Sequence, residues 1–256
     1  MNALAALTLL RLTTMTPGVE GTSAVASVTS AAPGSTIWVA LRIDLEEGYH
    51  VYYQNPGDTG FGTTVNWSTT KGTTASPTQY AFPKRITDAT SVSIGYEESA
   101  YFATKITIPK DFKGKSLTVT GESRFLVCKN DCVPGNASIK VTIPIGKTTA
   151  NPAWAKTAGN NLWPSGEGMQ ASAKRKGNEI WLEVNSNVQG TVDFVPSEDA
   201  YYLGKLGKVV YAEGGYTIPI YLKEERAKDP KRLKGLLFLQ NPGSKPKVLL
   251  IDTPIN

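Results

Sequence analysis

Short segments of alternating apolar and polar residues recur in this chain about every ten residues. One covers residues 35–43 and places Ile37, Val39 and Leu41 on the same side. Further segments of this kind cover residues 48–53, 63–68, 101–108, 116–121, 123–128 and 137–144. A period of two is typical of strands with one buried face, and the Asn-Pro-Gly-Asp run at residues 55–58 marks a turn. We therefore expect an all-β fold built as a sandwich.

The strand pattern stops at residues 146–164 and then starts again. The break contains Asn151-Pro152 and a short segment around Trp154 that favours a helix. Strands are then expected at residues 168–174, 179–184, 190–195, 208–211, 216–222, 235–239 and 247–251, with a helix at 224–233. We predict two β-sandwich domains in tandem, residues 18–146 and 147–256. Residues 1–17 are expected to be disordered or the remnant of a signal peptide.

The composition indicates a β protein, and the N-terminal segment suggests that it acts outside the cytoplasm. Of its 256 residues 40% are hydrophobic, enough for packed cores, and the net charge is +5. The lysines are spread along the chain rather than interleaved with aromatic residues, so nucleic-acid binding is not expected. Residues 3–10 resemble the apolar part of a signal peptide, and they are too short to span a bilayer, which needs about 20 residues. No other segment is a candidate membrane span.

The only two cysteines are Cys128 and Cys132. In an extended strand their Cα atoms would lie roughly 13 Å apart, whereas a disulfide needs them within about 7 Å. If the two bond, the intervening Lys129-Asn130-Asp131 must turn, and asparagine and aspartate are good turn formers. The sequence therefore predicts a strand, a tight turn and a return strand, with the two sulfurs facing each other across the turn.

Three interpretations of the cysteine pair stay open at this point. A structural disulfide is common in exported β proteins, although so short a loop contributes only about 2 kcal/mol. A redox-active pair is the second interpretation, because exposed disulfides are the labile kind. The third is handling of copper or another soft metal, although structural zinc usually takes four ligands and the only histidine is His50. No hydrolase triad or glycine-rich phosphate loop is visible, and no cofactor is expected.

Several motifs resemble one known family. Residues 48–60 read Gly-Tyr-His-Val-Tyr-Tyr-Gln-Asn-Pro-Gly-Asp-Thr-Gly, and they are followed by Phe-Pro-Lys-Arg at 82–85 and Ile-Gly-Tyr-Glu at 94–97. Leu-Val-Cys at 126–128 then precedes Cys-Val-Pro at 132–134. In this order the motifs resemble the DsbD-like and ScsB-like N-terminal periplasmic region of bacterial thiol:disulfide interchange proteins. Residues 192–196 and 234–237 resemble the second β domain of the ScsB-like branch more loosely.

The resemblance implies an immunoglobulin-like fold for both domains and a role in thiol–disulfide exchange. Cys128 and Cys132 would be the redox pair of a protein-disulfide reductase component. It would relay electrons between a membrane or thioredoxin-fold redox partner and oxidised periplasmic proteins. His50 and Tyr52, two residues apart on one strand, would lie near the pair. The alternative functions are an immunoglobulin-like scaffold with a structural disulfide and a copper-handling protein.

The sequence departs from the family pattern in two places. The best-known branch has five residues between its cysteines, whereas here there are three. That branch also covers its disulfide with a loop that carries an aromatic residue. The corresponding residues 91–96 contain Ile94 and Tyr96 but no phenylalanine at the expected place.

Overall fold

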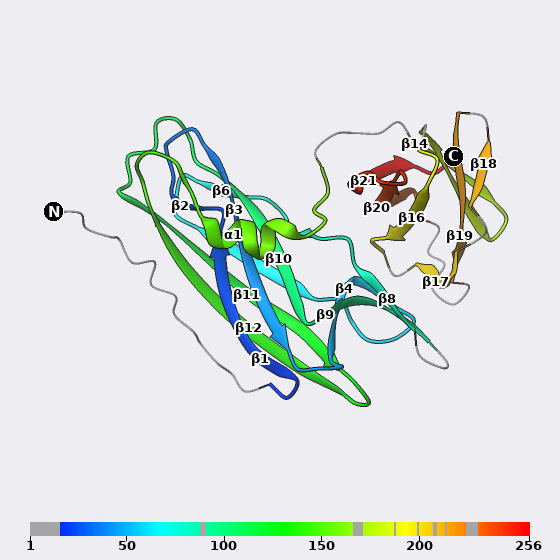
Figure 1. Ribbon diagram of the computed structural model, residues 1–256, viewed down its shortest axis with the longest axis horizontal. Coiled ribbons are helices and arrows are strands. Elements are labelled where there is room, and N and C mark those ends of the chain that lie inside the picture. Colours follow the sequence, from blue (N-terminus) through cyan, green and yellow to red (C-terminus); the bar gives the residue numbers. More distant parts are fainter. Residues whose placement is uncertain are drawn as a thin grey trace. The chain divides into compact units, whose positions relative to one another are not determined.

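The computed structural model describes residues 16–87, 91–165, 171–186, 188–198, 200–206, 209–212, 214–223 and 230–256 (Figure 1). These residues form strands joined by turns, together with one short helix and one 3-10 turn. The predicted all-β class is therefore confirmed. Residues 3–10, which resemble part of a signal peptide, lie outside the described residues.

The chain divides into two compact units. Unit 1 comprises the residues up to Val51, Thr63–Ala81 and Tyr96–Asn161. Unit 2 comprises Tyr52–Gly62, Phe82–Gly95 and Leu162–Asn256. Two segments that precede residue 146, Tyr52–Gly62 and Phe82–Gly95, are thus grouped with the C-terminal part of the chain, and we call them the inserted segments. The predicted tandem of domains 18–146 and 147–256 stays a prediction.

The first sheet of unit 1 has the order β1-β3-β10-β6, with β7 also paired to β10. Its strands are β1 (Val19–Ala26), β3 (Thr36–Leu45), β6 (Thr74–Ala75), β7 (Gln79–Tyr80) and β10 (Ser99–Thr107). The predicted alternation is visible in β3, where Ile37, Val39, Leu41 and Ile43 are buried. Trp38, Arg42 and Asp44, which alternate with them, are only partly buried. β2 (Val28–Ser30) pairs separately with β13 (Thr149–Ala150).

A second sheet has the order β12-β11-β4-β9-β8, with β5 also paired to β11. Its strands are β4 (His50–Gly57), β5 (Thr64–Thr69), β8 (Lys84–Thr87), β9 (Val92–Glu97), β11 (Ser116–Cys128) and β12 (Cys132–Pro144). β11 and β12 are the longest strands, and alternate residues of both are buried. Figure 1 shows this pair as two long green strands that run side by side. The helix α1 (Pro152–Lys156) and the 3-10 turn η1 (Ala158–Asn160) follow β13.

Unit 2 has a core of its own between two further sheets. One has the order β14-β15-β19-β17 with β18 beside β19, and the other has the order β16-β20-β21. Their strands are β14 (Ala171–Lys176), β15 (Glu179–Asn185), β16 (Thr191–Pro196), β17 (Tyr201–Leu206), β18 (Val210–Ala212), β19 (Gly215–Leu222), β20 (Arg232–Gln240) and β21 (Lys247–Pro254). Apolar residues from both sheets, such as Leu182, Phe194, Ile220 and Leu237, are fully buried in one cluster.

The structure differs from three of the predicted elements. Asn55 and Gly57, expected in a turn, belong to β4, and the chain turns only after Gly57, whose φ is +100°. Residues 84–87, for which no strand was predicted, form β8 because they pair with β9. Of the expected helix at 224–233, residues 224–229 lie outside the described residues, and Arg232 and Leu233 already belong to strand β20.

Candidate redox site

The site lies at the end of the longest hairpin in unit 1. β11 and β12 pair in unbroken register from Ser116 opposite Pro144 to Cys128 opposite Cys132. The Lys129 backbone N–H donates to the Asp131 carbonyl oxygen at 3.2 Å and closes the turn. The hairpin predicted from Lys129-Asn130-Asp131 is therefore confirmed. A regular ladder of this length delivers both cysteines to one place with little freedom.

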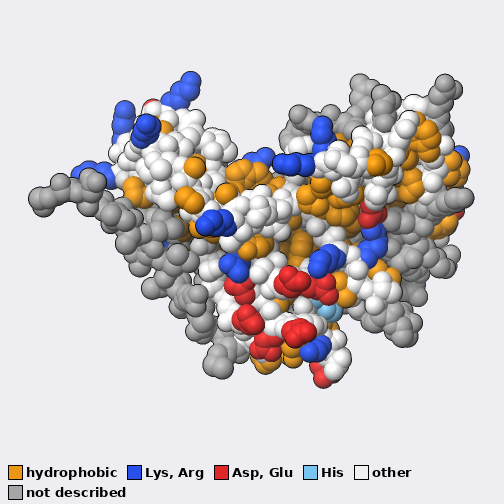
Figure 2. Space-filling model, in the orientation of Figure 1, with side chains coloured by type: hydrophobic (Ala, Val, Ile, Leu, Met, Phe, Trp, Pro, Cys, Tyr) orange, Lys and Arg blue, Asp and Glu red, His pale blue; other side chains and the backbone are white. Residues whose placement is uncertain are grey.

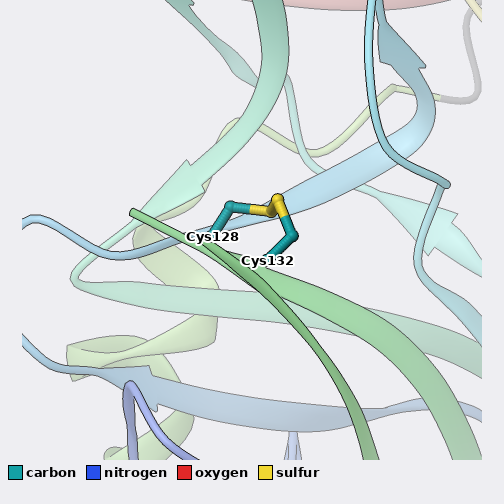
Figure 3. Close-up of a disulfide and its surroundings, with 2 residues drawn as sticks. All are labelled: Cys128 and Cys132. Atoms are coloured by element: carbon teal, nitrogen blue, oxygen red, sulfur yellow. A yellow bond between two sulfur atoms is a disulfide. The ribbon is translucent and has the colours of Figure 1, made fainter. Parts of the chain in front are cut away.

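The two cysteines form a disulfide across this turn. Their Cα atoms lie 4.2 Å apart, as is usual for residues that face each other in a non-hydrogen-bonded antiparallel pair. Figure 3 shows the disulfide linking the ends of the two strands. The predicted intramolecular disulfide is therefore confirmed. The spacing of the two cysteines in the sequence permits this disulfide. The register of the β11–β12 ladder brings the two sulfurs together.

The two cysteines differ strongly in their exposure. Cys128 is only 2% exposed, whereas Cys132 is exposed to solvent. The sheet order explains this difference. β11 has β12 on one side and β4 on the other, so Cys128 lies between two strands, while β12 is the edge strand of the sheet. An attacking thiolate from another protein can therefore reach the sulfur of Cys132 more easily than that of Cys128.

His50 is the residue opposite Cys128 on the other neighbouring strand. In the β11–β4 ladder, Cys128 pairs with His50 and Val127 pairs with Val51. His50 is half-buried, and its Nε2 atom is shielded from solvent. The structure thus brings three of the four predicted site residues together, namely Cys128, Cys132 and His50.

Tyr52, the fourth predicted site residue, belongs to unit 2. Its side chain is buried, and its ring packs over Gly60, where an added Cβ would come within 2.7 Å of the tyrosine Cζ. Gly60 has a φ of +83°, so this position favours glycine both for its backbone conformation and for the space that the ring occupies. The contact ties the end of β4 to the turn that follows it.

Sequence reasoning missed a contact that holds the cysteine turn from within unit 1. The Lys129 ammonium donates to the Glu47 carbonyl oxygen at 3.0 Å and lies 5.3 Å from the centre of the Tyr49 ring. The Tyr49 ring in turn fills the space beside Gly18, where a Cβ would come within 2.4 Å of it. The sequence signal was the Gly48-Tyr49 pair, in which Gly48 has a φ of +79° and makes the turn that presents the Glu47 carbonyl.

Acidic residues surround a shallow hollow in unit 1 close to this turn. The hollow has a volume of about 600 Å³, and the residues lining it include Glu20, Glu46, Glu47, Glu97 and Glu98. Figure 2 shows acidic side chains gathered in one area of the viewed face, although the chain as a whole carries a net charge of +5. Within the described residues, no group of three or more histidine, cysteine, aspartate or glutamate side chains is arranged to hold a metal ion.

The stretch that corresponds to the cap loop of the best-known branch is part of a strand here. Tyr96, in β9, is buried; its hydroxyl donates to the Ala81 carbonyl oxygen at 2.8 Å, and its ring packs edge-on against Phe102. Ile94 is also fully buried. Ile94 and Tyr96 are therefore both committed to packing.

Comparison with known proteins agrees with this site. The profile of the family described as "Thiol:disulfide interchange protein DsbD, N-terminal" matches residues 20–144, which contain both cysteines and His50. Residues 20–144 form a DsbD-like N-terminal domain. The family assignment and the close cysteine pair support thiol–disulfide exchange as the chemistry of this chain.

One solved structure shares the fold of this chain. The N-terminal periplasmic domain of ScsB from Proteus mirabilis matches with a TM-score of 0.63 at 13% identity, over 95% of this chain and 97% of that one. A conserved domain protein from Bacillus anthracis matches at 10% identity over 96% of this chain and 89% of that one, with a TM-score of 0.25. No curated protein sequence matches the chain. In the described part of the chain no helix is both long and apolar enough to cross a bilayer.

Proposed function

We propose that this DsbD-like protein relays electrons from a membrane redox partner to oxidised proteins of the periplasm through Cys128 and Cys132. The observation that carries the proposal is the unequal exposure of the two cysteines at the tip of one hairpin. Exchange needs one sulfur that a partner can reach and a second that resolves the mixed disulfide. Cys132 fits the first role and Cys128 the second.

Reduction begins at the exposed sulfur. A thiolate of the reduced partner attacks Cys132 Sγ, the Cys128–Cys132 bond breaks, and its electron pair leaves on Cys128 as a thiolate. The partner's second thiolate then attacks its own sulfur in the mixed disulfide and releases Cys132 as a thiolate. The partner has become a disulfide, and this protein has gained two electrons.

The electrons leave by the same route in reverse. The Cys132 thiolate attacks the disulfide of an oxidised substrate protein and forms a mixed disulfide, and the substrate's other sulfur leaves as a thiolate. Cys128 then attacks Cys132 Sγ, which restores the intramolecular disulfide and releases the second substrate thiolate. No cofactor takes part, because both half-reactions are exchanges between sulfurs.

We propose that His50 supports the buried sulfur. Cys128 is the leaving group in the first step and the nucleophile in the last, and both steps pass through its thiolate. An imidazole titrates near neutrality, so His50, opposite Cys128 in the ladder, can hold a proton beside the thiolate. Tyr52, two residues further along β4, is proposed to support the same strand by packing over Gly60.

The proposed partners are a membrane or thioredoxin-fold reductant and oxidised periplasmic proteins, and the proposed location is outside the cytoplasm. The family assignment of residues 20–144 and the description of the ScsB relative as periplasmic support both proposals.

Two cysteine variants test the proposal. Cys128→Ser leaves the exposed thiol without a resolving partner, so it should accumulate a mixed disulfide with a disulfide-bonded thioredoxin-fold protein. Cys132→Ser, the matched variant, should accumulate none. Both should unfold cooperatively in denaturant with a loss of about 2 kcal/mol, because the closed loop is short. Mass spectrometry of the products after alkylation measures the complex.

The opposite results would favour a structural disulfide. If neither variant captures a partner, and the wild-type disulfide has a reduction potential below about −300 mV, the bond resists reduction by periplasmic thiols. The chain would then be an immunoglobulin-like scaffold. A complex formed by Cys132→Ser alone would instead reverse the roles of the two cysteines.

A further inference from the structure

Cys132 is the first residue of an edge strand in unit 1. In the described part of the chain, residues 132–143 of β12 pair with β11 alone. Every second residue of this stretch has an exposed side chain, beginning with Cys132 and including Pro134, Ser138 and Lys140. The residues between them are buried or half-buried. The reactive sulfur therefore stands at the start of a long sheet edge.

The register of the hairpin determines which backbone groups of β12 face outward. The Lys129 backbone N–H donates to the Asp131 carbonyl oxygen, so these two residues form a hydrogen-bonded pair. Cys128 and Cys132 are then a non-hydrogen-bonded pair, as the distance of 4.2 Å between their Cα atoms also indicates. Because the two kinds of pair alternate along an antiparallel ladder, the backbone groups of every second residue from Cys132 onward point away from β11.

The far end of the same edge holds another backbone segment of this chain. Pro144 lies an even number of residues from Cys132, and its carbonyl oxygen accepts the Ala31 backbone N–H at 3.0 Å. Ala31 also forms a parallel bridge with Ile145. The outward direction worked out from the cysteine turn is thus correct at the other end of the strand. Where extended backbone is present beside this edge, the edge binds it.

A strand added beside β12 would bring a partner's sulfur to the correct side of Cys132. Displacement at sulfur needs aligned orbitals, so the attacking thiolate approaches from the side opposite the leaving sulfur. Cys128, the leaving group, lies on the inner side of β12, and the attack therefore comes from the outer edge. In an antiparallel added strand, the residue opposite Cys132 has its Cα atom about 5.5 Å away. A disulfide spans Cα distances of about 4.4 to 6.8 Å.

Two residues restrict which segments can bind this edge. Pro134 offers a carbonyl oxygen but no backbone N–H, and Lys140 carries a charge. Natural edge strands use both devices against indiscriminate pairing. A segment therefore needs a further interaction to stay on this edge, and a sulfur–sulfur bond with Cys132 supplies it. The occupant that fits is an extended segment that carries a thiol.

We propose that the reductant docks by adding an extended segment to the outer edge of β12, antiparallel to it, with its attacking cysteine opposite Cys132. This inference rests on the proposed function and names the binding mode of the partner. As the partner's sulfur bonds to Cys132 Sγ, the Cys128–Cys132 bond breaks and its electron pair leaves on Cys128. The partner residue two places before its cysteine donates its N–H to the Pro134 carbonyl oxygen. The residue six places before it donates to the Ser138 carbonyl oxygen.

The test uses the full 256-residue chain in its oxidised form and a synthetic peptide of about nine residues that contains one cysteine. In one peptide the backbone nitrogens two and six places before the cysteine are methylated, which removes both proposed donors. In the matched control the nitrogens one and five places before it are methylated, and these point away from β12. Mass spectrometry measures the rate of mixed-disulfide formation at Cys132. Reduced glutathione serves as a thiol without a strand.

The control peptide should react as fast as the unmethylated peptide. The peptide that lacks both donors should react about tenfold more slowly, since each lost hydrogen bond is worth roughly threefold. On the protein side, Ser138→Pro removes an outward N–H and should slow the unmethylated peptide about threefold. Ser138→Ala keeps that N–H and should not slow it. Glutathione should react equally with all three proteins.

A second measurement does not depend on the exchange reaction. In Cys128→Ser, the remaining thiol of Cys132 is coupled to each peptide, or to glutathione, through an activated disulfide. Amide hydrogen exchange is then followed at Ser138. The unmethylated and control peptides should slow this exchange about tenfold relative to the glutathione conjugate, because the added strand protects the amide. The peptide that lacks both donors should not.

The proposal is overturned if all three peptides react alike, if the control peptide is slowed as much as the other, or if no coupled peptide protects Ser138. A folded Ser138→Pro variant that reacts like the wild type also counts against it. If that variant does not fold, the peptide comparison decides. If the wild-type disulfide reacts with neither the peptides nor glutathione, the proposed function fails, and the coupled Cys128→Ser protein still decides whether the edge binds an extended segment.

Discussion

The disulfide hairpin of unit 1 and a set of polar contacts within unit 2 use polar chemistry in opposite ways. In unit 2, Asn55 and Arg85 bond to residues 193–198, and Lys223 bonds to the Gly57 carbonyl oxygen; we call these contacts the β16 clamp. In the hairpin, alternate residues of β11 and β12 are buried and apolar, and the reactive group stands at an exposed tip. In the clamp, the groups that make specific contacts, such as Asn55 and Lys223, are themselves buried. An exposed sulfur is available to partners, whereas a buried amide or ammonium can act only on its own chain.

This difference assigns separate tasks to the two regions. The hairpin owes its geometry to a regular ladder and an apolar core, so it tolerates a polar, reactive end. The clamp owes its specificity to hydrogen bonds that water cannot replace, because each lost bond would leave a buried group unsatisfied. Changes to the hairpin tip should therefore alter chemistry more than stability, and changes to the clamp should do the reverse.

The largest effect on stability is expected at Gly57. Its φ is +100°, and an added Cβ would lie 2.3 Å from the Val92 carbonyl oxygen. The Asp58 backbone N–H donates to the same carbonyl oxygen, and the Asp58 carboxylate accepts the Val92 backbone N–H. Gly57→Ala should cost about 3 to 4 kcal/mol, combining a strained backbone of roughly 1 to 3 kcal/mol with the disturbance of these two hydrogen bonds. Urea unfolding measures the loss.

Gly72 supplies the control in unit 1. It has a φ of +88°, but nothing lies within 4 Å of an added Cβ. Gly72→Ala should therefore cost only the backbone term, roughly 1 to 2 kcal/mol. Equal losses of stability in the two variants would show that the close approach of the Val92 carbonyl oxygen to Gly57 adds nothing to the cost of the substitution. The expected contrast between the two glycines would then not exist.

A smaller effect is expected at high pH, through Tyr53. Burial raises the pKa of the Tyr53 hydroxyl to about 12 from its ordinary value of 10.0, while its hydrogen bonds with Ser197 and Gln54 act in the opposite direction. Because the folded pKa is the higher one, the neutral tyrosine stabilises the fold fully below pH 10. This contribution is lost as the pH rises from about 10 to about 12, to a total of roughly 3 kcal/mol.

Tyr53→Phe isolates that contribution. The variant should be less stable than the wild type near neutrality, because Ser197 loses its partner, and the difference should shrink as the pH rises above 10. Urea unfolding at several alkaline pH values measures it. Parallel loss of stability in both proteins would mean that the Tyr53 hydroxyl titrates in the fold as it does in the unfolded chain.

The sequence predicted the hairpin far better than the clamp, and the reason is the range of the interactions. Cys128, the turn and Cys132 are neighbours in the chain, so turn chemistry and the reach of a disulfide decide their arrangement locally. The Asn-Pro-Gly-Asp run was interpreted as a turn from its composition alone. Asn55 instead bonds carbonyls more than 140 residues away, and no local pattern encodes such a partner.

The domain division shows the same limit. The restart of strand periodicity after residue 164 indicated a second region, and apolar alternation correctly placed most of its strands. It could not indicate that residues 52–62 and 82–95 would be grouped with that region. Their attachment depends on single polar side chains such as Arg85 and Asp193, which look like ordinary surface charges in the sequence.

The smallest effect is expected at Lys129, the tie between the cysteine turn and the rest of unit 1. Its ammonium bonds the Glu47 carbonyl oxygen and lies over the Tyr49 ring, but the side chain is exposed, so water and salt weaken both contacts. Lys129→Met should cost less than about 1 kcal/mol. Lys140→Met, an exposed lysine of β12, is the control.

A double-mutant cycle with Tyr49→Leu separates this contact from a general loss of charge. A coupling of about 0.5 kcal/mol between Lys129 and Tyr49 that falls at high salt would show that the turn is held from within unit 1. A coupling energy of zero, with equal effects of Lys129→Met and Lys140→Met on stability, would mean that the lysine does not hold the turn. The ladder register of β11 and β12 alone would then position the two sulfurs. In that case the rate of exchange should also be unchanged in Lys129→Met, since the register does not depend on the lysine.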